Sequence, residues 1–311
     1  IPTPATPETV YDLASLTKCI ATGMLCAKLI EEGRIHLDEP VSRVLPEFGE
    51  IARQPGYDDR ARVTFRHLLT HCAGLPAGGA YAGKTVSIDQ IVADIARSRR
   101  VSVPGTQFLY SDFSAIALGA AIERIERAPL DIVARERLFS PLGMDSTRYK
   151  PGPFLAPRCA STVPDVDTSA NRGRVHDPTA RALGGVAGHA GLFSTVDDLA
   201  RVAQLILDGG TYAGFRFLRP ETVRLATTPQ SPFAGETRGL AWDIDSAYHI
   251  RGALSRDSFG HTGFTGTSIW IDRTAQCFVI LLTNAVHAQP PVRTVIPLRR
   301  ELSSAVANAL R

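Results

Sequence analysis

The first long apolar stretch of the chain, residues 15–32, has the period of an amphipathic helix. Its apolar residues recur at roughly helical spacing and are Leu16, Ile20, Leu25, Leu29 and Ile30. Gly33 follows the stretch, and a glycine just beyond the last periodic residue is a common helix stop. The pattern therefore predicts one helix that runs from Ser15 to Glu32.

The rest of the chain changes texture near residue 237. Before this point the pattern predicts helices joined by loops, over residues 87–100, 112–127, 130–138 and 195–209. After it, short runs predict strands at 240–244, 267–271 and 277–283, of which the last two form a hairpin. Residues 292–310 predict a closing helix.

This arrangement predicts the α+β class, with an antiparallel sheet flanked by helices and a mostly helical inserted region. We expect two regions that are discontinuous in sequence. Residues 1–40 and 236–311 would form the sheet region, and residues 41–235 the mostly helical one. A seam between two such regions is a usual place for a pocket, so we expect the functional residues there.

Composition and charge narrow the classes of function. The chain has 311 residues, 44% hydrophobic and 21% charged, as in an ordinary globular protein. Its 34 basic and 31 acidic residues give a formal net charge of +3, which is too balanced to favour nucleic acid or an anionic membrane as a partner. No apolar run reaches the roughly 18 residues that a membrane helix needs.

The five cysteines predict neither a disulfide framework nor a metal site of the Cys-x-x-Cys type. Cys19 and Cys26 lie in the predicted helix at a separation of about 10 Å by helix rise, which is too far for a disulfide.

The predicted helix opens with Ser15-Leu16-Thr17-Lys18, which has the spacing of a serine nucleophile and its base. Residues i and i+3 share a helix face, so Lys18 would lie one turn beneath the Ser15 hydroxyl. A serine hydroxyl needs a neighbouring base, and a desolvated neutral lysine can serve. The structural alternatives are a serine that caps the helix and a solvated helix lysine.

Two further motifs follow in order. Tyr-Ser-Asp at 110–112 comes after a Pro-Gly turn and precedes an apolar helix. His-Thr-Gly at 261–263 leads into Phe264 and the predicted strand that ends at residue 271.

Together the three motifs resemble the signature elements of the serine β-lactamase and penicillin-binding superfamily: Ser-x-x-Lys, Tyr-x-Asn or Ser-x-Asn, and Lys-Thr-Gly. Residues 67–76, 141–147 and 191–199 resemble further landmarks of the family. The tyrosine form of the second motif resembles class C β-lactamases, related esterases, and D-aminopeptidase-like or DD-carboxypeptidase-like hydrolases. Family members usually carry a helix and two strands before the nucleophile helix, and this sequence, which starts at Ile1, shows no counterpart of them.

The resemblance implies a serine hydrolase that acts through an acyl-enzyme on a small-molecule ester, peptide or β-lactam, with no metal or organic cofactor. Ser15 would be the nucleophile and Lys18 the base, and Tyr110 would pass a proton to the leaving atom. The backbone N–H groups of Ser15 and Phe264 would form the oxyanion hole. Gly263 would let the backbone approach the ligand closely.

Two residues depart from the family pattern. Asp112 stands where the family more often has Asn, and an ionised Asp beside Lys18 would favour the charged lysine. His261 replaces the Lys of Lys-Thr-Gly, whereas Thr262 and Gly263 match the other two residues of that motif. A histidine is mostly neutral at pH 7 and gains charge only as the pH falls. This favours an esterase or a D-amino-acid peptidase over an efficient β-lactamase.

Three residues are weaker candidates. Asn284 and Arg293 lie where class C relatives place polar groups that face a substrate carboxylate, although Arg293 also fits an ordinary surface arginine. His189 belongs to a Gly-rich segment, 184–191, that lacks the Lys of a phosphate loop, and we expect this segment near the cleft.

Other functions stay open from the sequence: a β-lactamase proper, a penicillin- or peptidoglycan-binding domain without turnover, and a metal-dependent hydrolase. The last alternative rests on the i, i+4 spacing of His67 and His71, with His36, His176 or His189 as further ligands. The Glu of a His-Glu-x-x-His motif is missing from it.

Overall fold

The computed structural model describes residues 4–163, 171–231, 236–246, 250–288 and 295–310. Its main sheet is antiparallel, with the strand order β10-β9-β8-β7-β6. The strands are β6 (Thr237–Arg238), β7 (Asp243–Asp245), β8 (Ser258–Thr262), β9 (Ser268–Asp272) and β10 (Cys277–Leu281). Two helices, α8 (Val196–Leu207) and α10 (Val295–Ala309), pack against β10. The predicted hairpin is therefore confirmed as β9 and β10, and the predicted closing helix as α10.

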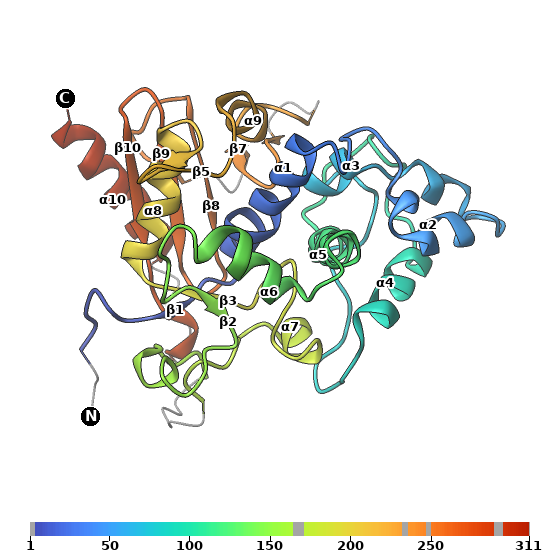
Figure 1. Cartoon of the computed structure of the whole chain (residues 1–311), viewed down its shortest axis with the longest axis horizontal. Helices are drawn as coiled ribbons and strands as arrows, with labels where there is room; N and C mark the ends of the chain where they lie inside the picture. Colours follow the sequence, from blue (N-terminus) through green and yellow to red (C-terminus); the bar gives the residue numbers. More distant parts are fainter. Residues whose placement is uncertain (1–3, 164–170, 232–235, 247–249, 289–294, 311) are drawn as a thin grey trace.

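The helix formed by residues 18–31 is named the nucleophile helix after its predicted role. The helices distant from the sheet lie on its other side (Figure 1). They are α2 (Pro46–Ile51), α3 (Phe65–Leu69), α4 (Ile88–Arg97) and α5 (Asp112–Glu126). Shorter elements follow them: α6 (Leu130–Ala134), η4 (Arg135–Phe139), α7 (Pro178–Ala182) and α9 (Pro220–Ala226). Single turns occur at η2 (Val41–Arg43), η3 (Asp58–Arg62), η5 (Ala156–Arg158) and η6 (Ala285–His287).

Short strands form two further sheets. A three-stranded sheet has the order β1-β3-β2, formed by β1 (Tyr11–Asp12), β2 (Arg148–Tyr149) and β3 (Leu192–Ser194). A separate hairpin pairs β4 (Thr211–Tyr212) with β5 (Phe215–Arg216). Because β1 pairs with β3, the segment that leads into the nucleophile helix is fixed against the segment that follows the Gly-rich loop.

The nucleophile helix is more deeply buried than its sequence pattern predicts. It consists of a π-helical part, η1 (Lys18–Gly23), followed by α1 (Met24–Glu31), and Gly33 comes after it with a positive φ of 69°. Every residue of η1 is buried, so the amphipathic pattern holds only for the end of the helix. Figure 1 shows α1 between the sheet and α5, and η1, which precedes α1, also contacts α5. This position explains why η1 has no solvent face.

One hydrophobic cluster runs through both predicted regions. It contains Phe259 and Ile269 of the sheet as well as Phe48 and Ile116 of the helices. The mixed helix and antiparallel sheet architecture confirms the predicted fold class. The division into residues 1–40 with 236–311 and residues 41–235 stays a prediction. None of the described helices is both long and apolar enough to cross a membrane.

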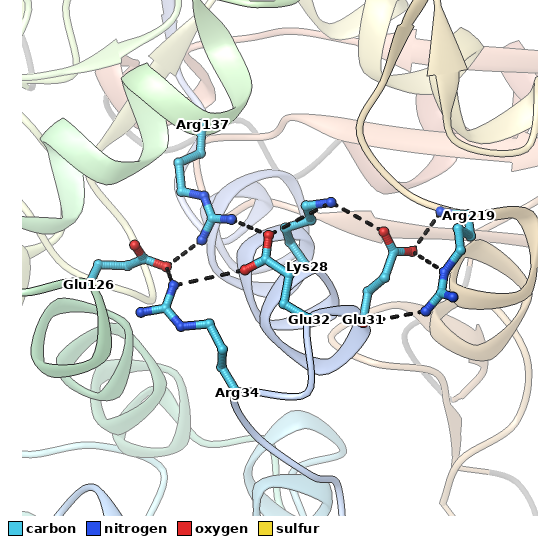
Figure 2. Close-up of polar contacts among 7 residues, drawn as sticks. All are labelled: Lys28, Glu31, Glu32, Arg34, Glu126, Arg137 and Arg219. Atoms are coloured by element: carbon cyan, nitrogen blue, oxygen red, sulfur yellow. Dashed lines mark hydrogen bonds and ion pairs between the residues drawn. The ribbon is translucent and has the colours of Figure 1, made fainter.

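A network of ion pairs holds the end of α1 to its neighbours (Figure 2). Its members are Lys28, Glu31, Glu32, Arg34, Glu126, Arg137 and Arg219. Glu126, at the end of α5, accepts from Arg34 at 2.5 Å and also pairs with Arg137. Glu31 accepts from the backbone N–H of Arg219 at 2.6 Å. The network therefore joins α1, α5, η4 and the start of α9.

We expect Glu126→Gln to lower the free energy of unfolding by about 1 kcal/mol, because it leaves two guanidinium groups facing an uncharged amide. Urea unfolding with an unchanged m value measures this loss. Glu136→Gln is the control, since the Glu136 side chain is 63% exposed and pairs only with its neighbour Arg135 among the described residues. Equal midpoints for Glu126→Gln and the wild type would contradict the expectation.

Candidate active site

Ser15 lies on a sharp turn just before the helix. The preceding residue, Ala14, has a positive φ of 47°, a region that costs a non-glycine residue about 1 kcal/mol. Its N–H donates to the Asp12 Oδ1 at 2.9 Å, and its carbonyl accepts from the N–H of Thr17 at 3.0 Å. Asp12 therefore stabilises the turn that presents Ser15.

Lys18 lies beneath Ser15, as the i, i+3 spacing predicts. Its Nζ donates to Ser15 Oγ at 3.0 Å and to the carbonyl of His189 at 3.1 Å. The same Nζ forms an ion pair with Asp112 Oδ1 at 2.8 Å, and the side chain is 1% exposed. The ammonium group thus has three acceptors in a buried setting.

The surroundings of Lys18 favour its charged form. Burial lowers the pKa of Lys18, but Tyr110 and Asp112 raise it by more, so its net pKa lies above the ordinary value. Asp112 therefore favours the charged form of Lys18, as expected for an ionised Asp where the family more often has Asn. In the free protein Lys18 is an ammonium group at neutral pH, and it has to lose a proton before it can accept one from Ser15.

We expect Asp112→Asn to move the basic limb of the kcat/KM profile to lower pH by about one unit or more. The substitution removes a negative charge 2.8 Å from Lys18, so the pKa of Lys18 falls and its ammonium form is lost at lower pH. The profile is measured with an uncharged ester. Asp89→Asn removes an exposed carboxylate of α4 and serves as the control. A basic limb that stays in place would show that the Lys18 ammonium does not limit the reaction.

Tyr110 lies beside Lys18, between two histidines. Its ring centroid is 4.9 Å from Lys18 Nζ, 4.5 Å from the His71 ring and 5.9 Å from the His261 ring. His71 also orients the Tyr110 backbone, because its Nδ1 accepts from the N–H of Ser111 at 3.1 Å. The ring is thus held at its position by packing from both sides.

His67 and His71 do not form the ligand pair of the metal alternative. His67 Nδ1 accepts from the N–H of Thr64 at 3.2 Å as part of a helix cap, and His71 Nδ1 accepts from the N–H of Ser111. Among the described residues, the one group of three possible metal ligands includes neither histidine. Burial, followed by Arg238 and Lys18, holds the pKa of His71 well below its usual range, so the ring is neutral.

His261 is on β8 and is also buried, with 3% of its surface exposed. Its Nδ1 donates to the Thr262 carbonyl at 2.8 Å, which leaves Nε2 as a buried acceptor without a partner among the described residues. Burial, followed by Arg238 and Lys18, holds its pKa well below 6.5. We therefore expect no cation at this position in mild acid, in contrast to the sequence-based expectation that charge appears as the pH falls.

The loop after His261 is bound to the turn before Ser15. Thr265 Oγ1 donates to the Asp12 carbonyl at 2.7 Å, and Thr267 Oγ1 donates to the Leu13 carbonyl at 3.0 Å. A Cβ atom at Gly263 would lie 2.5 Å from the Leu13 carbonyl oxygen, so only glycine fits this close approach. These bonds fix the loop that carries Phe264 relative to the segment that carries Ser15.

Arg299 of α10 holds the same loop from its other side. The guanidinium donates to the carbonyls of Gly263 at 2.9 Å, Gly266 at 3.1 Å and Thr267 at 2.8 Å. Burial lowers the pKa of Arg299 to about 10. Sequence reasoning missed this residue, because an arginine near the start of a terminal helix has the pattern of a surface residue.

Arg238 is a second arginine that the sequence did not indicate. It is 2% exposed, and its guanidinium carbon lies 5.1 Å from the Phe108 ring and 5.8 Å from the Tyr110 ring. Its charge contributes to the lowered pKa of both His71 and His261. A single arginine on a short strand gives no local signal for such a role.

His189 takes part in the site mainly through its backbone. Its carbonyl accepts from Lys18, and its Nε2 lies 2.8 Å from Asp177 Oδ1. Burial raises the pKa of Asp177, but His189, the Ala180 N–H and Lys18 together lower it by more, so the carboxyl group is ionised. Asp112, Asp177 and His189 offer possible metal-ligand atoms within 4.8 Å of one another, yet the Lys18 ammonium already neutralises Asp112.

Three predicted site residues remain: Asn284, Arg293 and Phe264. Asn284 donates from Nδ2 to the Ser161 carbonyl at 2.9 Å, a contact that holds a loop. Arg293 lies outside the described residues. The Phe264 side chain is 77% exposed.

Comparisons with known proteins show the family to which the chain belongs. The family model described as "Beta-lactamase" matches residues 2–303. A protein of Escherichia coli (strain K12) named "Putative D-alanyl-D-alanine carboxypeptidase" is 34% identical over 315 residues, which cover 92% of this chain and 71% of that protein.

Two solved structures share the fold at lower identity. "EstCE1, a hydrolase with promiscuous acyltransferase activity" superposes with a TM-score of 0.76 at 22% identity, covering 97% of this chain and 86% of the other. The β-lactamase/D-alanine carboxypeptidase of Pseudomonas syringae gives a TM-score of 0.73 at 19% identity, covering 96% and 86%. With a family match over nearly its whole length, the chain belongs to the β-lactamase family of hydrolases.

Proposed function

We propose that the protein is a serine hydrolase that cleaves an uncharged ester or a D-amino-acid amide through an acyl-enzyme on Ser15. The observation that carries the proposal is the contact of 3.0 Å between Lys18 Nζ and Ser15 Oγ, at a buried site where Tyr110 lies against the same Nζ. A nucleophile, an ammonium group and a phenol within contact distance form the proton-transfer set that acyl transfer requires.

Acylation begins when Ser15 Oγ attacks the carbonyl carbon of the substrate. Because Lys18 is already protonated, we assign the role of base to Tyr110 in its phenolate form, whose negative charge the Lys18 ammonium stabilises. The phenolate oxygen accepts the Ser15 proton as Oγ attacks, and Tyr110 thereby becomes a neutral phenol. The N–H groups of Ser15 and Phe264 stabilise the oxyanion. Tyr110 then protonates the leaving oxygen or nitrogen as the C–O or C–N bond breaks, and water releases the acyl group by the reverse transfers.

The choice of substrate rests on charge. At the position of the carboxylate-binding lysine the protein has a neutral, buried His261. A substrate carboxylate there would lose a charged hydrogen bond worth about 1.5–3 kcal/mol. The similarity to a D-alanyl-D-alanine carboxypeptidase supports peptide substrates, and the neutral site supports uncharged esters.

A turnover panel tests the proposal: short acyl esters, D-alanyl peptides with a free or an amidated C-terminus and a chromogenic cephalosporin, together with labelling by a fluorescent penicillin. We expect turnover of the esters or of the amidated D-alanyl peptides, which carry no carboxylate, to exceed that of the cephalosporin. Faster cephalosporin hydrolysis would indicate a β-lactamase proper. Penicillin labelling without turnover of any member would indicate a binding domain.

A further inference from the structure

Phe264 combines a catalytic backbone with an exposed aromatic side chain. It follows His-Thr-Gly directly, and its N–H is the proposed second donor of the oxyanion hole. Its side chain nevertheless remains 77% exposed, while other aromatic residues at the site, such as Tyr110, are at least half-buried. A substrate carbonyl bound to this N–H would lie within one side-chain length of the Phe264 ring.

The ring of Phe264 packs against a second aromatic ring. It stacks on His176, with the ring centroids 5.5 Å apart and an interplanar angle of 23°. The N–H of His176 donates to Asp12 Oδ2 at 2.7 Å, and Asp12 also stabilises the turn before Ser15. On the other side, Arg299 and the threonine hydroxyls fix the loop that carries Phe264. The backbone of both residues is therefore held to the segment that carries Ser15.

The two rings present an uncharged surface. Burial, followed by Arg181, lowers the pKa of His176, so its imidazole is neutral at pH 7 and stacks as an aromatic ring. A stacked aromatic pair with an exposed ring is suited to pack against a flat or apolar group, and such ring contacts add to the gain from burying apolar area.

We propose that Phe264 and His176 form an aromatic platform that binds an apolar, preferably aromatic, group of the substrate beside Ser15. The platform makes the protein select uncharged substrates with an aryl group next to the scissile bond. This inference rests on the proposed function, because it assigns the substrate class of the same site.

The test compares three uncharged esters by titration of the released acid: methyl acetate, methyl phenylacetate and benzyl acetate. The second ester carries the aromatic group on the acyl side and the third on the leaving side. We expect Phe264→Ala to lower the kcat/KM ratio of one aromatic ester to methyl acetate by about tenfold, which corresponds to about 1.4 kcal/mol. The affected ester shows which side of the bond meets the platform. His176→Ala lowers the same ratio by a smaller factor.

Phe154→Ala is the matched control, since Phe154 is 92% exposed and lies outside the site. It leaves all three rates unchanged. If Phe264→Ala lowers all three rates in parallel, or none, the platform is refuted. Failure of the proposed function gives a different result: Ser15→Ala then hydrolyses the esters at the wild-type rate, whatever the ratio in Phe264→Ala.

Discussion

Ser15→Ala abolishes hydrolysis, with an expected loss in kcat of about 10³-fold or more, the scale of other covalent nucleophiles. The substitution removes the oxygen that would form the bond to the substrate carbonyl. It removes little volume, and Lys18 keeps its contacts to Asp112 and to the His189 carbonyl. The fold therefore remains intact, and the thermal midpoint stays near that of the wild type.

The measurement pairs kinetics with mass spectrometry of a trapped acyl-enzyme or of a serine phosphonate adduct. The adduct is expected on the peptide that contains Ser15. Ser140→Ala changes an exposed serine at the end of η4 and serves as the control, with full activity and the same adduct. An adduct on any other residue, or residual turnover close to the wild type, would refute the assignment of the nucleophile.

The sequence predicted the secondary structure well where caps and turns are formed by residues close together in the chain. The capping box of Ser87 with Gln90 is present at the start of α4, and the hairpin of β9 and β10 forms where turn residues separate two β-rich runs. The π-helical part of the nucleophile helix was missed, because Lys18–Gly23 is surrounded by tertiary neighbours that a period of 3.6 residues does not reveal.

The site depends on contacts between segments that are distant in the sequence. The sequence indicated Ser15, Tyr110 and His261 only through the order of three motifs. In the fold, the Tyr110 ring centroid lies 4.9 Å from Lys18 Nζ and 5.9 Å from the His261 ring centroid. Arg238 and Arg299 escaped notice because their roles follow from burial against loops far away in the sequence. The direction of Asp112 toward Lys18 could be expected, since charge alone favours the contact.

Tyr110→Phe is expected to lower kcat by about 10²- to 10⁴-fold, the range for a positioned acid or base. The substitution keeps the ring between His71 and His261 and removes only the hydroxyl group. The hydrogen-bond partner of the Ser15 hydroxyl among the described residues is the Lys18 ammonium, which cannot accept a proton. Loss of the Tyr110 hydroxyl therefore removes the proposed acceptor of the Ser15 proton. Tyr57→Phe is the control, since the Tyr57 hydroxyl donates to the Arg97 carbonyl, away from the site.

The leaving group separates the two tasks of Tyr110. An alkyl ester or an amide needs a proton on its leaving atom, whereas a nitrophenyl ester expels a stable anion without one. Tyr110→Phe should therefore slow the alkyl ester and the D-alanyl amide more than the nitrophenyl ester, and the remaining loss on the nitrophenyl ester measures the activation of Ser15. An equal loss on all three would mean that Tyr110 acts only on Ser15. Wild-type turnover of all three would mean that Tyr110 only packs, and that the proton leaves through Lys18.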